Sequence, residues 1–458
     1  MLKAAFYTLG CKVNYYETES LKGIFLQEGF DIVDFGVEAD LFVINTCTVT
    51  HVADRKSRQT IRRAKKLNPE ALVAVIGCYP QVNPEAIRAL PQVDLFLGTQ
   101  ERLSLPGLVK RRFQGQDKYG GISSYDHEGA AFEEMPWLKE QGRARAFLKI
   151  QDGCDRFCSY CVVPLARGPL RSLPLEKGLD YLREIGRAGF KEVVLTGIHL
   201  GLYGMDSQDR ESSLATFLEE AVKIEGIQRI RLSSIEPADF DEKLLEVISR
   251  GGKLCPHLHI PLQSGDNFIL SRMKRSYNTS FYASLLRDLR GSIADLAISS
   301  DIMVGFPGEE EKHFLNSLQF VRECAFSSLH VFKYSPRPGT EAATYSSPVK
   351  PEVQEKRSRE MIALGEELAQ QFQEQHLGRT FPVLFENKIE YSDLSCSSFP
   401  RECLLKEEKI TGNPLIWEGF TPNYLRVRAL GKPDWRGKVK HICLKKRYPN
   451  YLEGSEPG

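Results

Sequence analysis

Apolar and polar residues alternate with two different periods along the first part of the chain. Short apolar runs, typical of buried strands, lie at residues 3–9, 40–45, 71–76 and 93–97. Between them, the spacing of amphipathic helices is found at residues 17–28, 54–67 and 84–90. Strands that alternate with helices form parallel sheets with helical crossovers, so the pattern predicts a parallel α/β domain over residues 1–113.

A second series of alternating runs follows residues 114–143, which have little periodicity and predict a linker. Its strand-like runs lie at residues 146–150, 192–198, 229–235, 257–262, 297–304 and 328–334. Its helical stretches lie at residues 175–188, 213–225, 240–250, 280–289 and 309–323. Six such units suit a partial (β/α)6 barrel better than a closed eight-stranded one. We predict this barrel over residues 144–375, with functional residues at its C-terminal rim.

The pattern changes again after Gly378. Short runs separated by turn residues predict a small antiparallel β-barrel over residues 376–446, followed by a tail at 447–458. Residues 426–447 carry many basic side chains, with Trp435 and Tyr448 interleaved. Cationic and aromatic side chains on a small β-barrel suit the backbone and bases of RNA.

The composition is that of an ordinary globular protein, with 458 residues, 42% hydrophobic and 26% charged, and a formal net charge of +1. No apolar run reaches the ~18 residues of a membrane-spanning helix. The N-terminus lacks the apolar core of a secretory signal, so we expect a cytoplasmic protein that does not contact a membrane. The eleven cysteines then do not predict disulfides.

Because the net charge is close to zero, contact with nucleic acid requires a local basic patch. The predicted helix at residues 55–66, RKSRQTIRRAKK, has seven basic residues in twelve. Such a run is usually a solvated helix face. Since this helix starts close behind Cys47, a candidate ligand, contact with RNA phosphates is an equal alternative.

Three cysteines lie within eight residues, at Cys154, Cys158 and Cys161, in the spacing C-x3-C-x2-C. Thiolates are soft ligands for zinc, copper(I) or iron–sulfur clusters. Three of them suit a four-iron cluster that leaves one iron open to bind a small molecule. The alternative is a zinc site that takes its fourth ligand from a distant residue, such as His199 or His257.

Three further cysteines, Cys11, Cys47 and Cys78, each follow the end of a predicted strand. A parallel sheet brings the carboxyl ends of its strands to one edge, where ligands bind. We therefore expect these thiols to meet and to form a second site with three ligands, although isolated cysteines near strands are usually core residues.

The candidates at the barrel rim are residues at strand ends: Thr196, Gly197, Glu236 and Asp301. A glycine at a strand end lets a ligand approach the backbone. A carboxylate such as Glu236 can hold a ribose hydroxyl or an ammonium group, or it can cap a helix. Arg167 and Arg171 follow the cysteine loop, and we expect them either to meet a phosphate or carboxylate or to lie on the surface.

C-x3-C-x2-C followed by Pro164 resembles the cluster motif of radical S-adenosylmethionine (SAM) enzymes. TLGCKVN at residues 8–14, NTCT at 45–48 and GCY at 77–79 resemble the N-terminal domain of one branch, the methylthiotransferases. The resemblance covers most of the chain and includes the C-terminal barrel, whose position and texture are similar to a TRAM domain. The segment Thr196-Gly197-Ile198-His199 departs from the Gly-Gly-Glu motif of many radical SAM enzymes.

This resemblance implies two [4Fe–4S] clusters and SAM as cofactors. Cys154, Cys158 and Cys161 would hold the cluster that cleaves SAM, and Cys11, Cys47 and Cys78 the auxiliary cluster that supplies sulfur. Thr196, Gly197, Glu236 and Asp301 are the candidates for SAM contacts. The implied partners are tRNA, at adenosine 37 of its anticodon loop, and a low-potential electron donor. We expect a monomer.

The substrate follows from resemblance alone. Leu9, Lys12 and Val13 resemble the branch that acts on N6-threonylcarbamoyladenosine, whereas the isopentenyladenosine branch more often has Phe, Gln and Met there. Lys12 can pair with the carboxylate of the threonylcarbamoyl group. The alternatives are the isopentenyladenosine substrate, an aspartate of a ribosomal protein, or a non-catalytic RNA-binding protein that uses metal only to fold.

Overall fold

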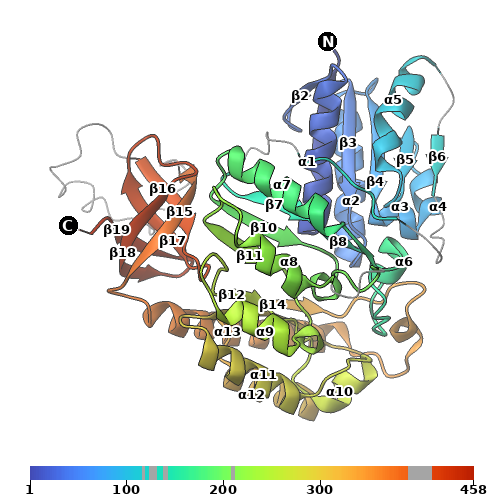
Figure 1. The fold of residues 1–458 in the computed structure, drawn as a ribbon. Helices are drawn as coiled ribbons and strands as arrows, with labels where there is room; N and C mark the ends of the chain where they lie inside the picture. The colour runs from blue at the N-terminus through green and yellow to red at the C-terminus, as the bar shows by residue number, and fades with distance from the viewer. Residues whose placement is uncertain (116–118, 123–130, 138–142, 208–211, 390–414, 458) are drawn as a thin grey trace.

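The computed structural model describes residues 1–457 except 116–118, 123–130, 138–142, 208–211 and 390–414. Figure 1 shows an N-terminal layer of parallel strands and helices, a central βα assembly, and a small separate barrel near the C-terminus. Among the residues described, we find no helix with the length and apolar character needed to cross a membrane.

The N-terminal domain is a six-stranded parallel sheet in the order β2-β1-β3-β4-β5-β6, which confirms the predicted sheet. Its strands are β1 (Lys3–Thr8), β2 (Asp31–Val33), β3 (Leu41–Thr46), β4 (Leu72–Gly77), β5 (Leu95–Leu97) and β6 (Tyr119–Gly121). Its helices are α1 (Lys12–Gln27), α2 (His51–Leu67), α3 (Cys78–Val82), α4 (Pro84–Arg88) and α5 (Leu105–Phe113). Strand β6 lies in the segment that we expected to be a linker, so part of that segment completes the sheet.

Helix α1 begins five residues before the predicted start at residue 17. Its first turns bury polar side chains, among them Asn14, Glu17 and Thr18. A hydrophobic pattern cannot reveal a helix that buries polar groups, and this explains the error.

The central domain has six parallel strands: β7 (Ala146–Lys149), β10 (Glu192–Thr196), β11 (Arg229–Leu232), β12 (His257–His259), β13 (Ala297–Val304) and β14 (Ser328–Lys333). Isolated parallel bridges from Ile230 to Leu254 and from Ser234 to His259 connect the two three-stranded halves. The predicted partial barrel is therefore confirmed. Around it lie α7 (Leu175–Arg187), α8 (Leu214–Ala221), α9 (Glu242–Ser249), α11 (Thr279–Ser292), α12 (Glu311–Cys324) and α13 (Pro351–Glu374).

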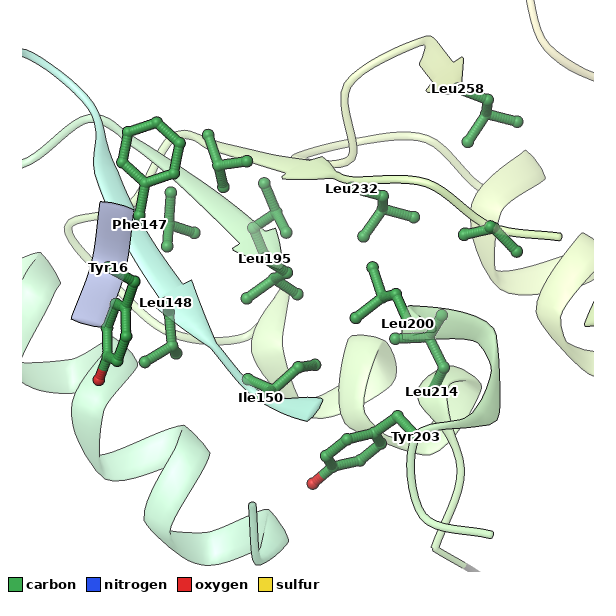
Figure 2. Packing of buried hydrophobic residues seen from close by; sticks show 14 of the residues in the cluster. Tyr16, Phe147, Leu148, Ile150, Leu195, Leu200, Tyr203, Leu214, Leu232 and Leu258 are labelled. Carbon is green, nitrogen blue, oxygen red and sulfur yellow. The ribbon is translucent and has the colours of Figure 1, made fainter. Parts of the chain in front are cut away.

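Short elements connect these units: β8 (Gln151–Asp152), α6 (Val163–Arg167), β9 (Arg171–Ser172) and α10 (Asn267–Arg272). The first two domains share one hydrophobic cluster, in which Tyr16 of α1 joins Phe147, Leu148 and Leu195 of the barrel (Figure 2). The Tyr16 hydroxyl also donates a hydrogen bond to the Met135 carbonyl at 2.7 Å. The sheet domain is therefore packed firmly against the barrel.

The C-terminal barrel is closed, in the order β15-β16-β17-β19-β18. Its strands are β15 (Thr380–Ile389), β16 (Leu415–Phe420), β17 (Arg426–Gly431), β18 (Val439–Tyr448) and β19 (Tyr451–Ser455). The predicted tail is wrong at this point, because β19 closes the barrel by pairing in parallel with β17. The other pairs are antiparallel, as predicted. Strand β19 is short and carries Glu453 and Gly454, so its pattern does not stand out from a polar tail.

Candidate metal centres

The three strand-end cysteines meet at one edge of the N-terminal sheet. Cys11 follows β1, Cys47 follows β3 and Cys78 follows β4, and these strands are adjacent. The thiols are close enough that Cys11 and Cys78 both act electrostatically on Cys47. Gly10 allows this approach, because it has φ +104° and a Cβ there would lie 2.9 Å from Cys47 Cβ. We call this group the sheet trio.

Asn14 fixes the backbone around the sheet trio. Its Nδ2 donates to the Leu9 carbonyl at 2.8 Å and to the Thr46 carbonyl at 3.0 Å, which joins the ends of β1 and β3. Its Oδ1 accepts a long contact of 3.6 Å from the Cys11 thiol and a hydrogen bond from Arg167. One buried amide therefore holds two of the cysteine-bearing loops together.

Buried ion pairs support the sheet trio from the side of the barrel. Arg167 of α6 donates to Glu17 Oε1 at 2.6 Å, and Arg102 and Lys149 lie 2.7 and 3.2 Å from the same oxygen. Asp152 shares the cations, with its Oδ2 3.2 Å from Lys149 Nζ. The surface alternative for Arg167 is therefore wrong: it is 1% exposed and pairs with carboxylates of its own chain.

Arg171 is also buried, and it donates to the Arg167 carbonyl at 2.6 Å. Arg167 additionally acts on the Cys78 thiol, since its positive charge opposes the rise in that pKa caused by burial. Arg167, which ends α6 just past the loop that carries Cys154, Cys158 and Cys161, therefore reaches the sheet trio.

The second group, which we call the loop trio, consists of Cys154, Cys158 and Cys161. The Cys161 amide donates to the Cys158 carbonyl at 2.9 Å, and the Cys154 amide donates to the Gly168 carbonyl at 3.0 Å. Gly153, with φ +75°, is required beside Cys154, because a Cβ there would lie 1.7 Å from the Pro169 carbonyl oxygen. The thiols act electrostatically on one another.

Two side chains lie against the loop trio: His199, which the sequence offered as a distant zinc ligand, and Arg275, which it did not single out. Arg275 Nη1 is 3.3 Å from Cys158 Sγ, and the same guanidinium pairs with Glu236. His199 Nδ1 is 3.3 Å from Cys154 Sγ, while its Nε2 lies 2.5 Å from Asp239. Arg275 has no sequence signal of its own, since it lies in a helix–helix connection far from the cysteines.

Burial makes four of the six thiols harder to ionise than a free cysteine. Burial raises the pKa of Cys47 to about 12, that of Cys154 to about 11 and that of Cys161 to about 12. Burial also raises the pKa of Cys78. Metal ligands are thiolates, so metal loading must displace these protons, as is usual for cysteine sites.

The ligand atoms of the two trios are not as close together as the ligands of a single zinc ion. About a Zn²⁺ ion with Zn–S bonds of about 2.3 Å, tetrahedral thiolates lie roughly 3.8 Å apart. Among the described residues, only His259, Asp301 and His330 bring three ligand atoms within 4.8 Å of one another. Neither trio does so, and no third ligand joins Cys154 and His199 at that spacing within the described part of the chain.

The predicted rim residues have different surroundings. Glu236 pairs with Arg275, which contacts the loop trio. Thr196 is the last residue of β10, and a Cβ on the next residue, Gly197, would lie 2.7 Å from Gln151 Oε1. Asp301 instead pairs with His259 and His330, each at 3.2 Å. Contact of these four residues with SAM stays a prediction.

The basic stretch forms most of α2, which begins four residues after Cys47. Its buried residues are Asp54, Ser57, Ile61 and Ala64. Arg55, Lys56, Arg62, Arg63 and Lys66 are not among them. The structure therefore leaves a cationic surface beside the sheet trio, and contact with RNA stays a prediction.

The partial barrel and its loop of three cysteines define the class of protein, that of the radical SAM enzymes. The model described as the Radical SAM superfamily matches residues 148–321, and that of the uncharacterized protein family UPF0004 matches residues 3–98. In structure, the chain is similar to TsrM, a radical S-adenosylmethionine methyltransferase from Kitasatospora setae, with a TM-score of 0.54, 14% identity and 74% of each chain covered. That likeness concerns the fold.

The chain is 41% identical to the threonylcarbamoyladenosine tRNA methylthiotransferase MtaB of Bacillus subtilis, over 99% of this chain and 96% of the relative. It is 38% identical to MtaB of Aquifex aeolicus, over 85% and 94% of the two chains. A tRNA-2-methylthio-N(6)-dimethylallyladenosine synthase of Geobacillus thermodenitrificans is 35% identical, over 83% and 73%. The chain belongs to the radical SAM tRNA methylthiotransferase family, whose cofactors are SAM and [4Fe–4S] clusters.

Proposed function

We propose that this chain is a radical SAM methylthiotransferase that adds sulfur and a methyl group to C2 of N6-threonylcarbamoyladenosine at position 37 of tRNA. The observation that carries this proposal is the 41% identity to the Bacillus subtilis enzyme of that name over nearly the whole of both chains. The dimethylallyladenosine synthases match at lower identity and over less of the Geobacillus relative. The two cysteine trios supply the two metal sites that such a reaction requires.

The loop trio would hold the cluster that binds SAM, and the sheet trio the auxiliary cluster. When bound, the first cluster and SAM would supply the radical chemistry, the auxiliary cluster the sulfur, and a second SAM the methyl group. The chain's own residues orient them. Arg275 offers a positive charge to Cys158, which stabilises a thiolate. Asp239 fixes the His199 ring beside Cys154. Thr196, Gly197, Glu236 and Asp301 are our candidates for the SAM site.

Lys12, the first residue of α1, would bind the carboxylate of the threonylcarbamoyl group. It follows Cys11 directly, so a base held beside the sheet trio would place its N6 substituent within reach of the lysine. An isopentenyl group has no charge to pair with an ammonium, so this contact favours the threonylcarbamoyl substrate.

We further propose that the enzyme acts in the cytoplasm as a monomer, recognises the anticodon loop through α2 and the C-terminal barrel, and receives electrons from a low-potential donor. The cations on the outer face of α2 and the basic residues of the barrel support the RNA contact. The family relationship supports the donor.

The experiment is anaerobic incubation of the metal-loaded protein with SAM, reductant and tRNA that carries threonylcarbamoyladenosine, followed by mass spectrometry of the nucleosides. A methylthio gain on threonylcarbamoyladenosine is the expected result. A gain only on isopentenyladenosine tRNA would overturn the substrate and keep the reaction. RNA binding without cleavage of SAM, by protein that carries both clusters, would favour a non-catalytic RNA-binding protein.

A further inference from the structure

Within the described part of the chain, three buried arginines near the junction of the barrel and the C-terminal domain share two carboxylates. Arg231 Nε lies 2.7 Å and Arg229 Nη1 3.5 Å from Glu192. Arg145 pairs with Glu386 at 2.6 Å and is 3.8 Å from Glu192. Buried charges are normally balanced, so this region carries an excess of positive charge.

Tyr424, in the turn between β16 and β17 of the C-terminal barrel, lies against these cations. Its ring is 4.6 Å from the Arg231 guanidinium and 4.7 Å from the ring of His257 on β12. Its hydroxyl accepts a hydrogen bond from Arg145 at 3.3 Å. Burial acts to raise the pKa of Tyr424, but the positive charge of Arg145 and the other cations outweigh it, so the pKa is lowered. The hydroxyl proton is therefore ready to be donated to an acceptor.

The turn that carries Tyr424 is held in place by its own hydrogen bonds. Tyr424 has φ +66°, a conformation that few non-glycine residues adopt. The Leu425 amide donates to Thr421 Oγ1 at 2.8 Å, and the Tyr424 amide donates to the Thr421 carbonyl at 3.0 Å. A strained backbone that the surroundings maintain is frequent at ligand sites.

Lys12 adds a fourth cation to this region, and this one is free to bind a ligand. Solvent reaches its side chain, and it has no hydrogen-bond or carboxylate partner among the residues that the structure describes. Its ammonium interacts electrostatically with Tyr424, Arg145 and Arg231. An anion placed beside these cations would be attracted by their combined positive charge.

His257 is 7% exposed, and its Nδ1 has no hydrogen-bond partner in the described structure. Its Nε2 lies 3.4 Å from Ser299 Oγ, which can donate to it and so leave an N–H at Nδ1. Burial, together with Arg231 and Lys12, lowers the pKa of His257 well below its ordinary value, so the ring is neutral. A buried N–H without a partner is costly unless a ligand accepts its hydrogen bond.

We propose that Lys12, His257 and Tyr424 together bind the carboxylate of the threonylcarbamoyl group, so that the C-terminal barrel contributes to substrate specificity as well as to RNA contact. The three groups come from three domains, and each offers a hydrogen-bond donor near the excess positive charge. An apolar N6 substituent would leave these donors unpaired, which strongly disfavours it. This inference rests on the proposed function and extends it to particular residues.

The test compares two anticodon stem-loop RNAs, one with threonylcarbamoyladenosine and one with its carboxamide, which keeps the shape but removes the charge. We expect Tyr424→Phe to lower kcat/KM for the acid about tenfold and to change that for the carboxamide less than twofold. Lys12→Met, at a solvent-exposed position, should give the same selective loss. Tyr451→Phe, which removes a hydroxyl elsewhere in the same barrel, should change neither value.

Binding gives a readout that does not depend on turnover. By fluorescence anisotropy, the wild-type protein should bind the acid RNA more tightly than the carboxamide RNA, and both variants should lose that preference. If a variant loses affinity equally for the two RNAs, or if neither variant loses affinity or kcat/KM for the acid RNA, this inference is overturned while the proposed function stands. If the wild-type protein modifies neither RNA and binds both equally, the proposed function fails together with it.

Discussion

The loop trio and the sheet trio each consist of three cysteine thiols, but very different parts of the fold hold them in place. The loop trio comes from eight consecutive residues, with backbone hydrogen bonds from Cys161 to Cys158 and from Cys154 to Gly168. The sheet trio spans residues 11–78 and depends on the register of three neighbouring strands. Its flank is a buried network of charges, whereas Phe157 beside the loop trio is 64% exposed.

Damage to one site should therefore affect the rest of the protein differently from damage to the other. A local loop can lose its ligand without disturbing the rest of the fold. A site assembled from three strands and a charge network shares its stability with the packing of the first two domains. Loss of a ligand from the loop trio should therefore abolish chemistry and leave stability unchanged. Damage to the network beside the sheet trio should lower the stability of the first two domains.

The largest expected effect is on SAM cleavage. Replacing Cys158 by Ala should abolish 5′-deoxyadenosine formation, because the loop trio would lose a cluster ligand, and bound iron should fall from about eight to about four per chain. The melting temperature should stay close to that of the wild type. The control is Cys443→Ser, outside both trios, which should keep the activity. Retained SAM cleavage in the Cys158 variant would remove the loop trio from the reaction.

Cys47→Ala should separate the two steps. We expect no methylthio product, since the sheet trio would lose a ligand, but continued release of 5′-deoxyadenosine. Chromatography of the nucleosides and of the cleaved SAM measures both quantities in one sample. A variant that still forms the methylthio product would contradict our assignment of the auxiliary site.

The stability coupling is tested by Glu17→Gln. Glu17 is fully buried and pairs with Arg102, Lys149 and Arg167, so the variant leaves buried cations unmatched and should lose about 3–5 kcal/mol in the free energy of unfolding. Denaturant titration measures the loss. Glu19→Gln, on the same helix, removes a carboxylate that pairs with the single cation Lys22 and hydrogen-bonds Tyr15, and it should lose less.

The same network predicts an acid limit. The three cations hold the pKa of Glu17 well below its ordinary value. The stability from this group is therefore complete above the unfolded-state pKa of about 4.3 and declines as the pH falls toward the folded-state value. The Glu17→Gln variant should show a flatter decline below about pH 4. Identical pH profiles for the two proteins would contradict the network.

A smaller effect is expected at Arg275. Its side chain is 5% exposed and lies between Cys158 and Glu236, so Arg275→Gln should slow SAM cleavage about 10–100-fold without unfolding the protein. Lys274→Gln, the exposed neighbour, serves as the control. Iron content and the visible spectrum should show whether the cluster is still held. A rate that is unchanged would reduce Arg275 to a packing role.

The smallest effect concerns α2, whose first residue lies four positions after Cys47 of the sheet trio. Replacing Arg62, Arg63 and Lys66 by Gln should weaken tRNA binding several-fold and reduce the salt dependence of the binding constant by roughly 0.7–0.9 for each phosphate that is no longer neutralised. The same exchange at Lys243 and Arg250 near α9, which are also cationic, should have no effect. If the α2 variant and the Lys243/Arg250 variant lose equal tRNA affinity, the cations of α2 attract RNA only non-specifically.

Much of the structure of the two cysteine sites could be predicted from the sequence. What could not be predicted depends on contacts between distant residues. The spacing of Cys154, Cys158 and Cys161 is local, so it is visible directly. The meeting of Cys11 with Cys47 follows once alternating strands imply a parallel sheet. The hydrogen bond from Arg167 to Glu17 joins residues 150 positions apart, and no local pattern encodes it.

Polar residues in helices normally face solvent, so the buried positions of Asn14 and Glu17 could not be expected. Tyr424 reaches His257 only because the C-terminal barrel docks on the core, and docking depends on shapes that a sequence pattern does not contain. Strand β19 was missed for a related reason, since its place in the barrel is set by its partners β17 and β18.

The charge network at Glu17 also limits how this family can be recombined. A chimera that takes its N-terminal domain from one relative and its barrel from another would join a helix α1 to a foreign α6. If the new α1 lacked a carboxylate at position 17, Arg167 and Lys149 would be left to share Asp152, while Arg102 would keep its pair with Glu133. Functional chimeras should therefore require these side chains to be exchanged as one set, and residues at such positions should change together during evolution.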